Sequence, residues 1–428
     1  MLMRFGAANF GSLRTSQEIS LVASSLKDKG SHLIEVPEQK QSLLSSAILY
    51  GANASGKTTM LKAFYAMHNM LLHSHNRSSP TGGIQRNKFA LDPEMKDNVS
   101  QFDCDVIIDG VRYHYGFKLN DEEFLEEWLY AFPGGSRQSW FYRKKGEPIN
   151  FGKNLKGQNK STEALTRPNS LFLSAAAQNA HSQLTSIYSY FQKRFFFDLT
   201  PNPNPVMLPF LFAKNDFDRR ILSILNMADT GIVDVKLERK QGSEKQKMML
   251  SGLVDVISNV FPDIGPSAQE IDNIFPELRF AHSAKSGEKV FLDLDTESRG
   301  TIRLVELLGP CLRALDTGGI LFVDEIDTSL HTGLASAVIE LFSSNVSNPK
   351  GAQLIATTHD TNLLCSGALR RDQIWFVEKD SSGESSAYPL SDLKTRNTDN
   401  FEKGYLEGRF GAVPFTGNIQ KLFMEEAA

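Results

Sequence analysis

The chain has 428 residues, of which 41% are apolar and 22% are charged, and its formal net charge is −4. This length exceeds what one hydrophobic core usually serves, so we expect about two domains or lobes. The charge balance gives no electrostatic reason to expect a protein that wraps a polyanion. No apolar run approaches the roughly 20 residues that span a bilayer, and the amino terminus lacks an apolar signal core. Three cysteines without metal-ligand spacing, Cys104, Cys311 and Cys365, indicate a reducing compartment. We therefore expect a cytoplasmic protein with no membrane contact.

The first half of the chain predicts strands on both sides of one helix. Short strands are expected in the first fifty residues, and the last of them, SLLSSAILYG, leads into a glycine-rich loop. The helix after this loop is predicted by apolar residues at three- and four-residue intervals, namely Met60, Leu61, Phe64, Met67 and Leu71. Residues 74–97 lack a pattern and are predicted to be a loop. From 102 to 132 the residues alternate, and Asp109-Gly110 predicts a hairpin turn in an antiparallel sheet.

The second half divides into a helical stretch and a return to strands. Residues from about 161 to 260 are predicted to be mostly helical, including NAHSQLTSIYSYFQKRFF. In the last third, apolar strands alternate with helices, which predicts a parallel sheet flanked by helices. We expect three parts: 1–160, a mostly helical insertion at 161–290, and 291–428, with one sheet assembled from both ends of the chain.

The strongest local pattern is Gly51-Ala-Asn-Ala-Ser-Gly56-Lys57-Thr58, a G-x-x-x-x-G-K-T loop between a predicted strand and a predicted helix. Such a loop binds nucleotide phosphates because its glycines let backbone N–H groups approach them at a helix N-terminus. Lys57 would reach the β and γ oxygens, and Thr58 would bind Mg²⁺. A glycine-rich turn without a ligand is the alternative. The other loop residues expected to contact ATP are Asn53, Ser55 and Thr59.

Two acids follow the apolar strand in GGILFVDEID. Asp324 is predicted to hold Mg²⁺, directly or through its water, and Glu325 to orient or deprotonate the attacking water. Taken alone, the pair is equally typical of a solvated strand end. Since 324 − 57 = 267 positions separate Asp324 from Lys57, we expect a large insertion between two adjacent strands of one sheet.

A further apolar strand, in LIATTHD, delivers His359 to the same edge of the sheet. A histidine in this place is predicted to sense the γ-phosphate. A purely structural histidine is the alternative.

The order of these parts resembles that of the ABC-class ATPases, in the branch that contains RecF, SMC and OLD-like proteins. The resemblance implies an α/β fold, with an ABC-type P-loop NTPase head that has a mixed or parallel sheet, an antiparallel β subdomain and an inserted helical lobe. It also implies ATP and Mg²⁺ as cofactors and a homodimer that closes head to head around nucleotide.

Further site residues are implied by matching this chain to the class position by position. In TESRGT, Ser298 and Gly300 resemble the signature residues that contact the γ-phosphate bound to the opposite subunit. Asp327 would belong to the D-loop. Gln178 would be the residue of the glutamine loop that contacts the nucleotide and the metal.

Two positions depart from the pattern of the class. Arg299 stands where the usual signature has a second glycine, so an arginine would point into the dimer interface. Gly11 stands where relatives often place a basic residue, a role that Arg14 could take.

A closer resemblance spans nearly the whole chain. The segments NSLFLSAAAQN, MADTGIVDVKLERK and RRDQIWFVEKD are similar to those of stand-alone ATPases of bacterial defence and abortive-infection loci, the RloA-like and AriA-like (PARIS) proteins. This resemblance implies a separately encoded effector, often a nuclease of the TOPRIM kind, and a phage-encoded trigger. About 70 residues follow His359, too few for a TOPRIM domain, so we expect no nuclease in this chain.

Three hypotheses about function follow. The first is an ATP hydrolase that dimerises around nucleotide and regulates an effector in anti-phage defence. The second is an ATP-bound scaffold or antitoxin-like module with slow hydrolysis. The third is a RecF-like repair ATPase, for which hydrolysis would be stimulated by DNA and affinity would fall steeply with salt.

Overall fold

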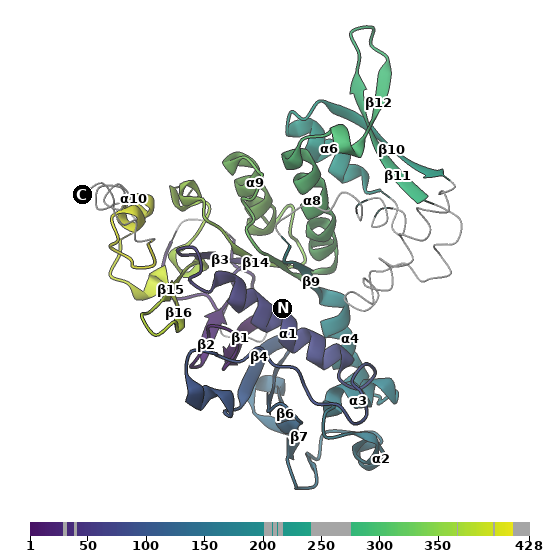
Figure 1. Cartoon of the computed structure of the whole chain (residues 1–428), viewed down its shortest axis with the longest axis vertical. Coiled ribbons are helices and arrows are strands. Elements are labelled where there is room, and N and C mark those ends of the chain that lie inside the picture. The colour runs from purple at the N-terminus through teal and green to yellow at the C-terminus, as the bar shows by residue number, and fades with distance from the viewer. Residues whose placement is uncertain are drawn as a thin grey trace, which may run out of the picture. The chain divides into compact units, whose positions relative to one another are not determined.

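The chain forms two compact units (Figure 1). The first unit consists of Met1–Leu199, Arg313–Asp327 and Ala335–Ala428, and the second of Thr200–Leu312 and Thr328–Leu334. The predicted boundaries after residues 160 and 290 differ from these, because residues 161–199 belong to the first unit. The computed structural model describes residues 1–28, 32–37, 41–200, 208, 212, 217–240, 275–365, 367–396 and 399–413.

A seven-stranded antiparallel sheet forms one layer of the first unit, in the order β2-β1-β4-β5-β6-β7-β8. The predicted hairpin is confirmed, since Ile108 pairs with Val111 across the turn. Asp109 and Gly110 have φ values of 47° and 80°, as a type I′ turn requires. The strands are β1 (Leu2–Ala8), β2 (Gln17–Ser20), β4 (Ser100–Ile108), β5 (Val111–Leu119), β6 (Phe124–Phe132), β7 (Gln138–Lys144) and β8 (Asn150–Phe151).

A six-stranded sheet forms the second layer of this unit, in the order β16-β15-β3-β14-β13-β9. Its strands pair in parallel except for β16, so the predicted parallel sheet is confirmed. One expectation is wrong: β3 and β13 are not adjacent, because the crossover through α9 (Thr332–Ser343) places β14 between them. The strands are β3 (Ser46–Tyr50), β9 (Phe195–Asp198), β13 (Ile320–Val323), β14 (Gln353–Thr357), β15 (Ile374–Lys379) and β16 (Ser385–Pro389).

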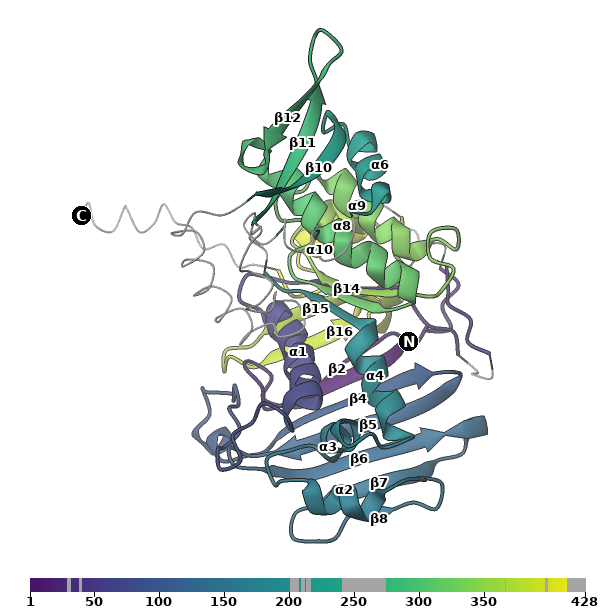
Figure 2. The same ribbon diagram turned by 90° about the vertical axis from the view of Figure 1, so that its right-hand side faces the viewer.

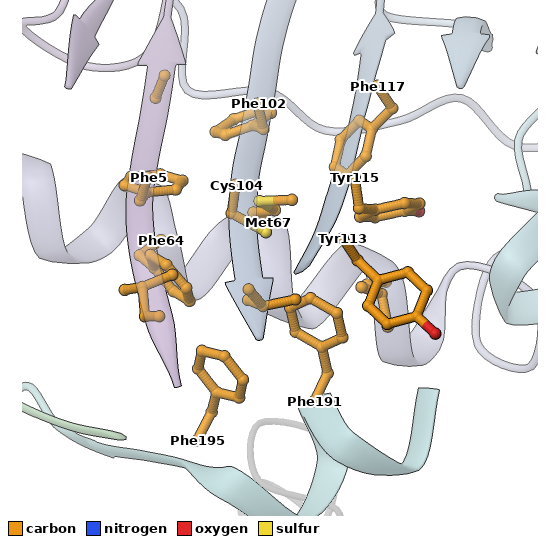
Figure 3. Close-up of a cluster of buried hydrophobic side chains, with 14 of the residues drawn as sticks. Phe5, Phe64, Met67, Phe102, Cys104, Tyr113, Tyr115, Phe117, Phe191 and Phe195 are labelled. Atoms are coloured by element: carbon orange, nitrogen blue, oxygen red, sulfur yellow. The ribbon is translucent and has the colours of Figure 1, made fainter. Parts of the chain in front are cut away.

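Helix α1 (Lys57–His73) packs between the two sheets, and its buried residues include all five predicted from the apolar spacing. The ring of Phe64 lies 4.5 Å from that of Phe5 in β1 and 4.5 Å from that of Phe322 in β13, measured between centroids. Figure 3 shows Phe64 in this core with Met67, and with Phe191 and Phe195 from the chain that follows the antiparallel sheet. Burying one such ring stabilises the fold by roughly 1.5–3 kcal/mol. This packing fixes the start of α1 against the parallel sheet.

The aromatic stretch after the antiparallel sheet is only partly helical. Helix α4 (Leu184–Arg194) ends where the prediction continued through Phe196, and the next residues form β9 at the edge of the parallel sheet. The strand forms because Phe195 and Phe197 pack on the core, where Phe197 stacks on Phe322 at 4.8 Å. Two shorter helices precede α4, namely α2 (Asn159–Leu165) and α3 (Phe172–Gln178).

The second unit is not a purely helical lobe. Its described residues include a three-stranded antiparallel sheet in the order β10-β11-β12, and the stretch MADTGIVDVKLERK supplies β10. Residues 161–290 are predicted to be mostly helical, and the described part of this range contains both α6 and strands β10 and β11. The elements are α6 (Arg219–Met227), β10 (Ile232–Lys240), β11 (Phe275–Ser283), β12 (Lys289–Asp293) and the first part of α8 (Arg299–Thr317), whereas most of the proline-rich TPNPNPVMLP and all of 241–274 lie outside the described residues.

Beyond β14, the first unit adds strands β15 and β16 to the parallel sheet and contains helix α10 (Phe401–Leu406). Phe376 of β15 stacks on Tyr405 of α10 at 5.4 Å, and Tyr50 at the end of β3 lies 6.2 Å from Tyr405. Among the described residues, no helix combines the length and apolarity needed to cross a membrane.

Candidate nucleotide-binding site

The loop between β3 and α1 needs its two outer glycines because other backbone and side-chain atoms approach closely. A Cβ at Gly51 would lie 2.2 Å from the carbonyl oxygen of Val377, and one at Gly56 would lie 2.2 Å from Ser385 Oγ. Gly56 also has a φ of 112°, which side chains rarely tolerate. Asn53 lies exposed at the tip of the loop, whereas Ser55 is buried. The loop thus opens directly into the N-terminus of α1.

Two serines from distant parts of the chain brace this loop. The hydroxyl of Ser385, in β16, donates to the carbonyl oxygen of Ser55 at 2.5 Å. Ser12 lies beside it: its Oγ is 2.7 Å from Ser385 Oγ, and its carbonyl oxygen accepts from Ser385 N at 2.8 Å. Neither serine was predicted, because single serines far apart in sequence carry no recognisable pattern.

The side chain of Lys57 is hydrogen-bonded to the backbone of the phosphate loop. Its Nζ donates to the carbonyl oxygens of Gly51 at 2.8 Å and Ala52 at 3.0 Å. Burial lowers the pKa of Lys57 from 10.5 to about 8, although nearby carboxylates, chiefly Asp324, raise it. Ser55 Oγ is buried and, among the described residues, has no hydrogen-bond partner. A buried polar atom of this kind favours a ligand that supplies the missing bond.

Asp324 follows β13 and contacts the start of α1. Thr58 Oγ1 donates to Asp324 Oδ1 at 3.1 Å. The same carboxylate oxygen accepts from Thr357 Oγ1 at 2.6 Å. Thr58 and Asp324, the two residues expected to hold Mg²⁺, are therefore in direct contact.

Glu325 is placed by its backbone and by Thr357. Its φ of 50° lies in the left-handed region, where a non-glycine residue carries a conformational cost. Its N–H donates to Thr357 Oγ1 at 2.7 Å. The hydroxyl of Thr357 therefore bonds the carboxylate of one acid and the backbone of the next. Thr357 was missed at the sequence level because a threonine at the end of an apolar strand is ordinary.

Asp327 and His359 meet at the same edge of the sheet. Asp327 Oδ1 accepts from Thr358 Oγ1 at 2.7 Å and from the backbone N–H of His359 at 3.3 Å. Burial lowers the pKa of His359, and the charge of Lys57 lowers it further, against the opposing effect of the acids. The lowered pKa favours the neutral form of the His359 imidazole.

Gln178, which is predicted to contact the nucleotide and the metal, lies near the end of α1 that is opposite the phosphate loop. Its side-chain amide lies 3.4 Å from the hydroxyl of Tyr188, which donates to the carbonyl oxygen of Leu72 at 2.9 Å. Leu72 is in the last turn of α1 and Thr58 in the first, so the two are about 21 Å apart along the helix. Figure 2 shows α3, which ends at Gln178, beside α1 and the antiparallel sheet.

Arg14, which could take the role of the basic residue that relatives often have at the position of Gly11, is bound by acidic side chains. Arg14 forms an ion pair with Asp92 at 2.6 Å, and Glu384 lies 3.7 Å away. Its guanidinium is thus engaged by acids of the same unit. Gly11 lies against α1, since a Cβ there would be 2.6 Å from Thr59 Cγ2. Thr59 therefore packs on the amino-terminal segment.

Ser298 and Gly300 lie in the second unit, at the start of α8. Ser298 Oγ accepts from the N–H of Thr301 at 3.0 Å, the geometry of an N-cap. A Cβ at Gly300 would lie 2.6 Å from the carbonyl oxygen of Ser329, which explains why a glycine is needed there. Ser298 and Arg299 are both exposed.

The residues fit ATP and Mg²⁺. A glycine loop at the N-terminus of α1, a buried lysine and the partnerless hydroxyl of Ser55 suit phosphate oxygens. The hydroxyl of Thr58 and the carboxylate of Asp324 are the oxygen ligands that Mg²⁺ prefers. With Glu325 and His359 at the same sheet edge, the fold and this loop define a P-loop nucleotide-binding protein of the ATPase class.

A match to a family model agrees with this class. Residues 46–366 match the model of the family described as "AAA domain, putative AbiEii toxin, Type IV TA system", and the chain belongs to that family. No curated protein matches the chain. Among solved structures, the chain is similar to one titled "Crystal structure of the SmcHead bound to the C-winged helix domain of ScpA", with 12% identity, a TM-score of 0.41, and coverage of 91% of this chain and 97% of that chain.

Proposed function

We propose that this chain hydrolyses ATP to ADP and phosphate. The observation that supports the proposal is that Asp324 contacts Thr58, beside Lys57, and that the charges of Asp324 and Glu325 act on Lys57. Lys57 and the loop N–H groups would bind the phosphates. Thr58 with Asp324 would hold Mg²⁺, which when bound would neutralise charge on the phosphate oxygens. Glu325 accepts a proton from the attacking water, and the neutral imidazole of His359 donates a hydrogen bond to the terminal phosphate.

We further propose that each site is completed by a second copy of the chain. Ser298 is exposed at the start of α8, where the helix dipole favours an anion. Its position matches the signature residue by which ABC-class heads contact nucleotide across a dimer. Closure around two ATP molecules and opening after hydrolysis would make the chain a nucleotide-controlled switch.

Mixing two inactive variants tests whether the site is shared. Lys57→Ala removes the phosphate contact, whereas Ser298→Asp keeps an N-cap residue but adds a charge that repels phosphate. In an equal mixture half of the dimers are mixed and each has one intact site, so about a quarter of wild-type hydrolysis should return. Phosphate release measured before and after mixing checks this.

The control for that experiment is a mixture of Lys57→Ala with the double variant Lys57→Ala/Ser298→Asp. It contains no intact phosphate loop and should remain inactive. A mixture of the two single variants that stays equally inactive would contradict a shared site.

We infer that the switch regulates a separately encoded effector in anti-phage defence, such as a TOPRIM-type nuclease, in response to a phage-encoded trigger. The family description, which names a toxin of a type IV toxin–antitoxin system, supports a role of this kind. Co-purification from the native locus tests it. Glu325→Gln with ATP and Lys57→Ala should retain different amounts of the effector. Equal retention would contradict nucleotide control and favour a static scaffold.

A further inference from the structure

Strand β12 in the second unit is an edge strand of the three-stranded sheet. In the part of the chain that the structure describes, it pairs with β11 only. All five of its residues are exposed, and the three central ones are apolar: Val290 is 46%, Phe291 36% and Leu292 38% exposed. Figure 2 shows β12 beside β11 and β10, with the β11–β12 loop at the end of the hairpin. Natural proteins usually cover such an edge or interrupt it with charge or proline.

The backbone groups of β12 that point to the open edge can be identified from the hairpin. The N–H of Ala284 donates to the carbonyl oxygen of Glu288 at 2.9 Å. Bonded and non-bonded pairs alternate along an antiparallel ladder, so Val290 and Leu292 direct their N–H and C=O groups toward β11. The backbone N–H and C=O groups of the alternate residues, Lys289, Phe291 and Asp293, consequently point away from β11, toward the open edge.

The sequence of β12, Lys-Val-Phe-Leu-Asp, is complementary to itself in the antiparallel direction. Pairing centred on Phe291 places Lys289 opposite Asp293 of another copy, and Val290 opposite Leu292. The outward backbone groups of 289, 291 and 293 then bond to those of the second copy. We propose that β12 pairs with β12 of a second copy of this chain, forming a two-fold symmetric, six-stranded sheet.

The charges near β12 are compatible with this pairing. Lys289 contacts Asp234 at 2.7 Å, and Asp293 contacts Arg279 at 2.9 Å, both on the face that carries Phe291. Lys289 and Asp293 are 54% and 62% exposed, so each can accept a second partner. On the opposite face, Val290 of one copy would contact Leu292 of the other, and both side chains would become less exposed to water.

A contact of two five-residue strands is smaller than a standard protein interface. It therefore forms at high local concentration, or when another contact already joins the copies and raises their effective concentration. The inference does not rest on ATP hydrolysis, because no residue of the nucleotide site takes part. Combined with a nucleotide-dependent dimer, a second two-fold contact would extend the assembly beyond two chains.

Disulfide trapping tests the pairing in the full-length chain without nucleotide. Residues facing each other in a bonded antiparallel pair have Cα atoms about 5.5 Å apart, which suits a disulfide. In a background with the exposed Cys365 replaced by serine, Phe291→Cys should give a covalent dimer under mild oxidation. Ser286→Cys, in the exposed loop of the same hairpin, is the matched control, since its two copies would lie about 33 Å apart.

Charge reversal then tests the register. In the Phe291→Cys background, Lys289→Asp or Asp293→Lys alone places like charges opposite each other and should lower the cross-linking yield severalfold. The double reversal should restore the yield, although it still disrupts the contacts with Asp234 and Arg279 within each chain. Equal cross-linking of Phe291→Cys and Ser286→Cys would overturn the proposal, as would a double reversal that behaves like the single ones.

Discussion

Replacing Glu325 by glutamine should lower the rate of ATP hydrolysis by about 10²- to 10⁴-fold, the usual contribution of a general base. The substitution removes the group that accepts the proton from water but keeps the size of the side chain. The N–H of residue 325 can still donate to Thr357 Oγ1, so the backbone should not move. ATP affinity should stay near that of the wild type, because the phosphate contacts belong to the loop and Lys57. Phosphate release and binding of a fluorescent ATP analogue measure the two effects separately.

The matched control is Glu340→Gln, the same chemical change at an exposed position of α9, which should leave hydrolysis unchanged. An unchanged hydrolysis rate in Glu325→Gln would remove Glu325 from the catalytic role. Loss of ATP binding in that variant would instead assign Glu325 to the architecture of the site.

ATP affinity should fall as pH rises above about 8, by about tenfold per pH unit. The cause is Lys57, whose pKa in the nucleotide-free protein is about 8. The phosphates favour its charged form, so binding at pH 9 requires uptake of a proton. The stability of the nucleotide-free protein changes in the opposite direction to its ATP affinity. Between pH 8 and 10.5, Lys57 binds more protons in the unfolded chain than in the folded protein. The contribution of Lys57 to the free energy of unfolding therefore rises with pH.

Calorimetry in two buffers of different ionisation enthalpy measures this proton uptake. It should approach one proton per ATP at pH 9 and be small at pH 7.5. His359 cannot account for the effect, because its pKa is lowered from 6.5 and His359→Gln should therefore keep the uptake at pH 9. An affinity that is constant from pH 7 to 9.5 would show that Lys57 remains charged without nucleotide.

The parts of the fold that the sequence predicts best are those with a strict local period. Helix α1 and the hairpin at Asp109-Gly110 each have one, and β13 and β14 are short apolar runs that end in polar residues. The order of the strands was harder to predict. A crossover connection places β14 between β3 and β13, and no local sequence pattern indicates it. Strand β9 was missed for a similar reason: its phenylalanines continue the helical spacing of α4, and only packing against Phe322 makes them a strand.

The site shows the same division between pattern and contact. Lys57, Thr58, Asp324 and Glu325 were predicted because the chemistry of phosphate and metal binding constrains their type and spacing. The assignment of Gln178 depends on the order of parts along the chain, and that order does not determine how far Gln178 lies from Thr58 at the other end of α1. The contact of Ser385 could not be predicted from the sequence, because it consists of one hydrogen bond to the loop that any serine could make.

The hydrogen bonds of Ser12 and Ser385 determine which residues a fragment must include to keep the phosphate loop in place. The family match covers residues 46–366 and includes the phosphate loop, both acids and the histidine. Yet a hydrogen bond to the loop comes from outside that range, from Ser385 in β16, and Ser385 in turn bonds to Ser12 near the start of the chain. A fragment cut to the family limits would carry every recognisable nucleotide residue and lose the scaffold that shapes the loop. The smallest piece of the chain that keeps this loop geometry is therefore larger than the family range and includes Ser12 and Ser385.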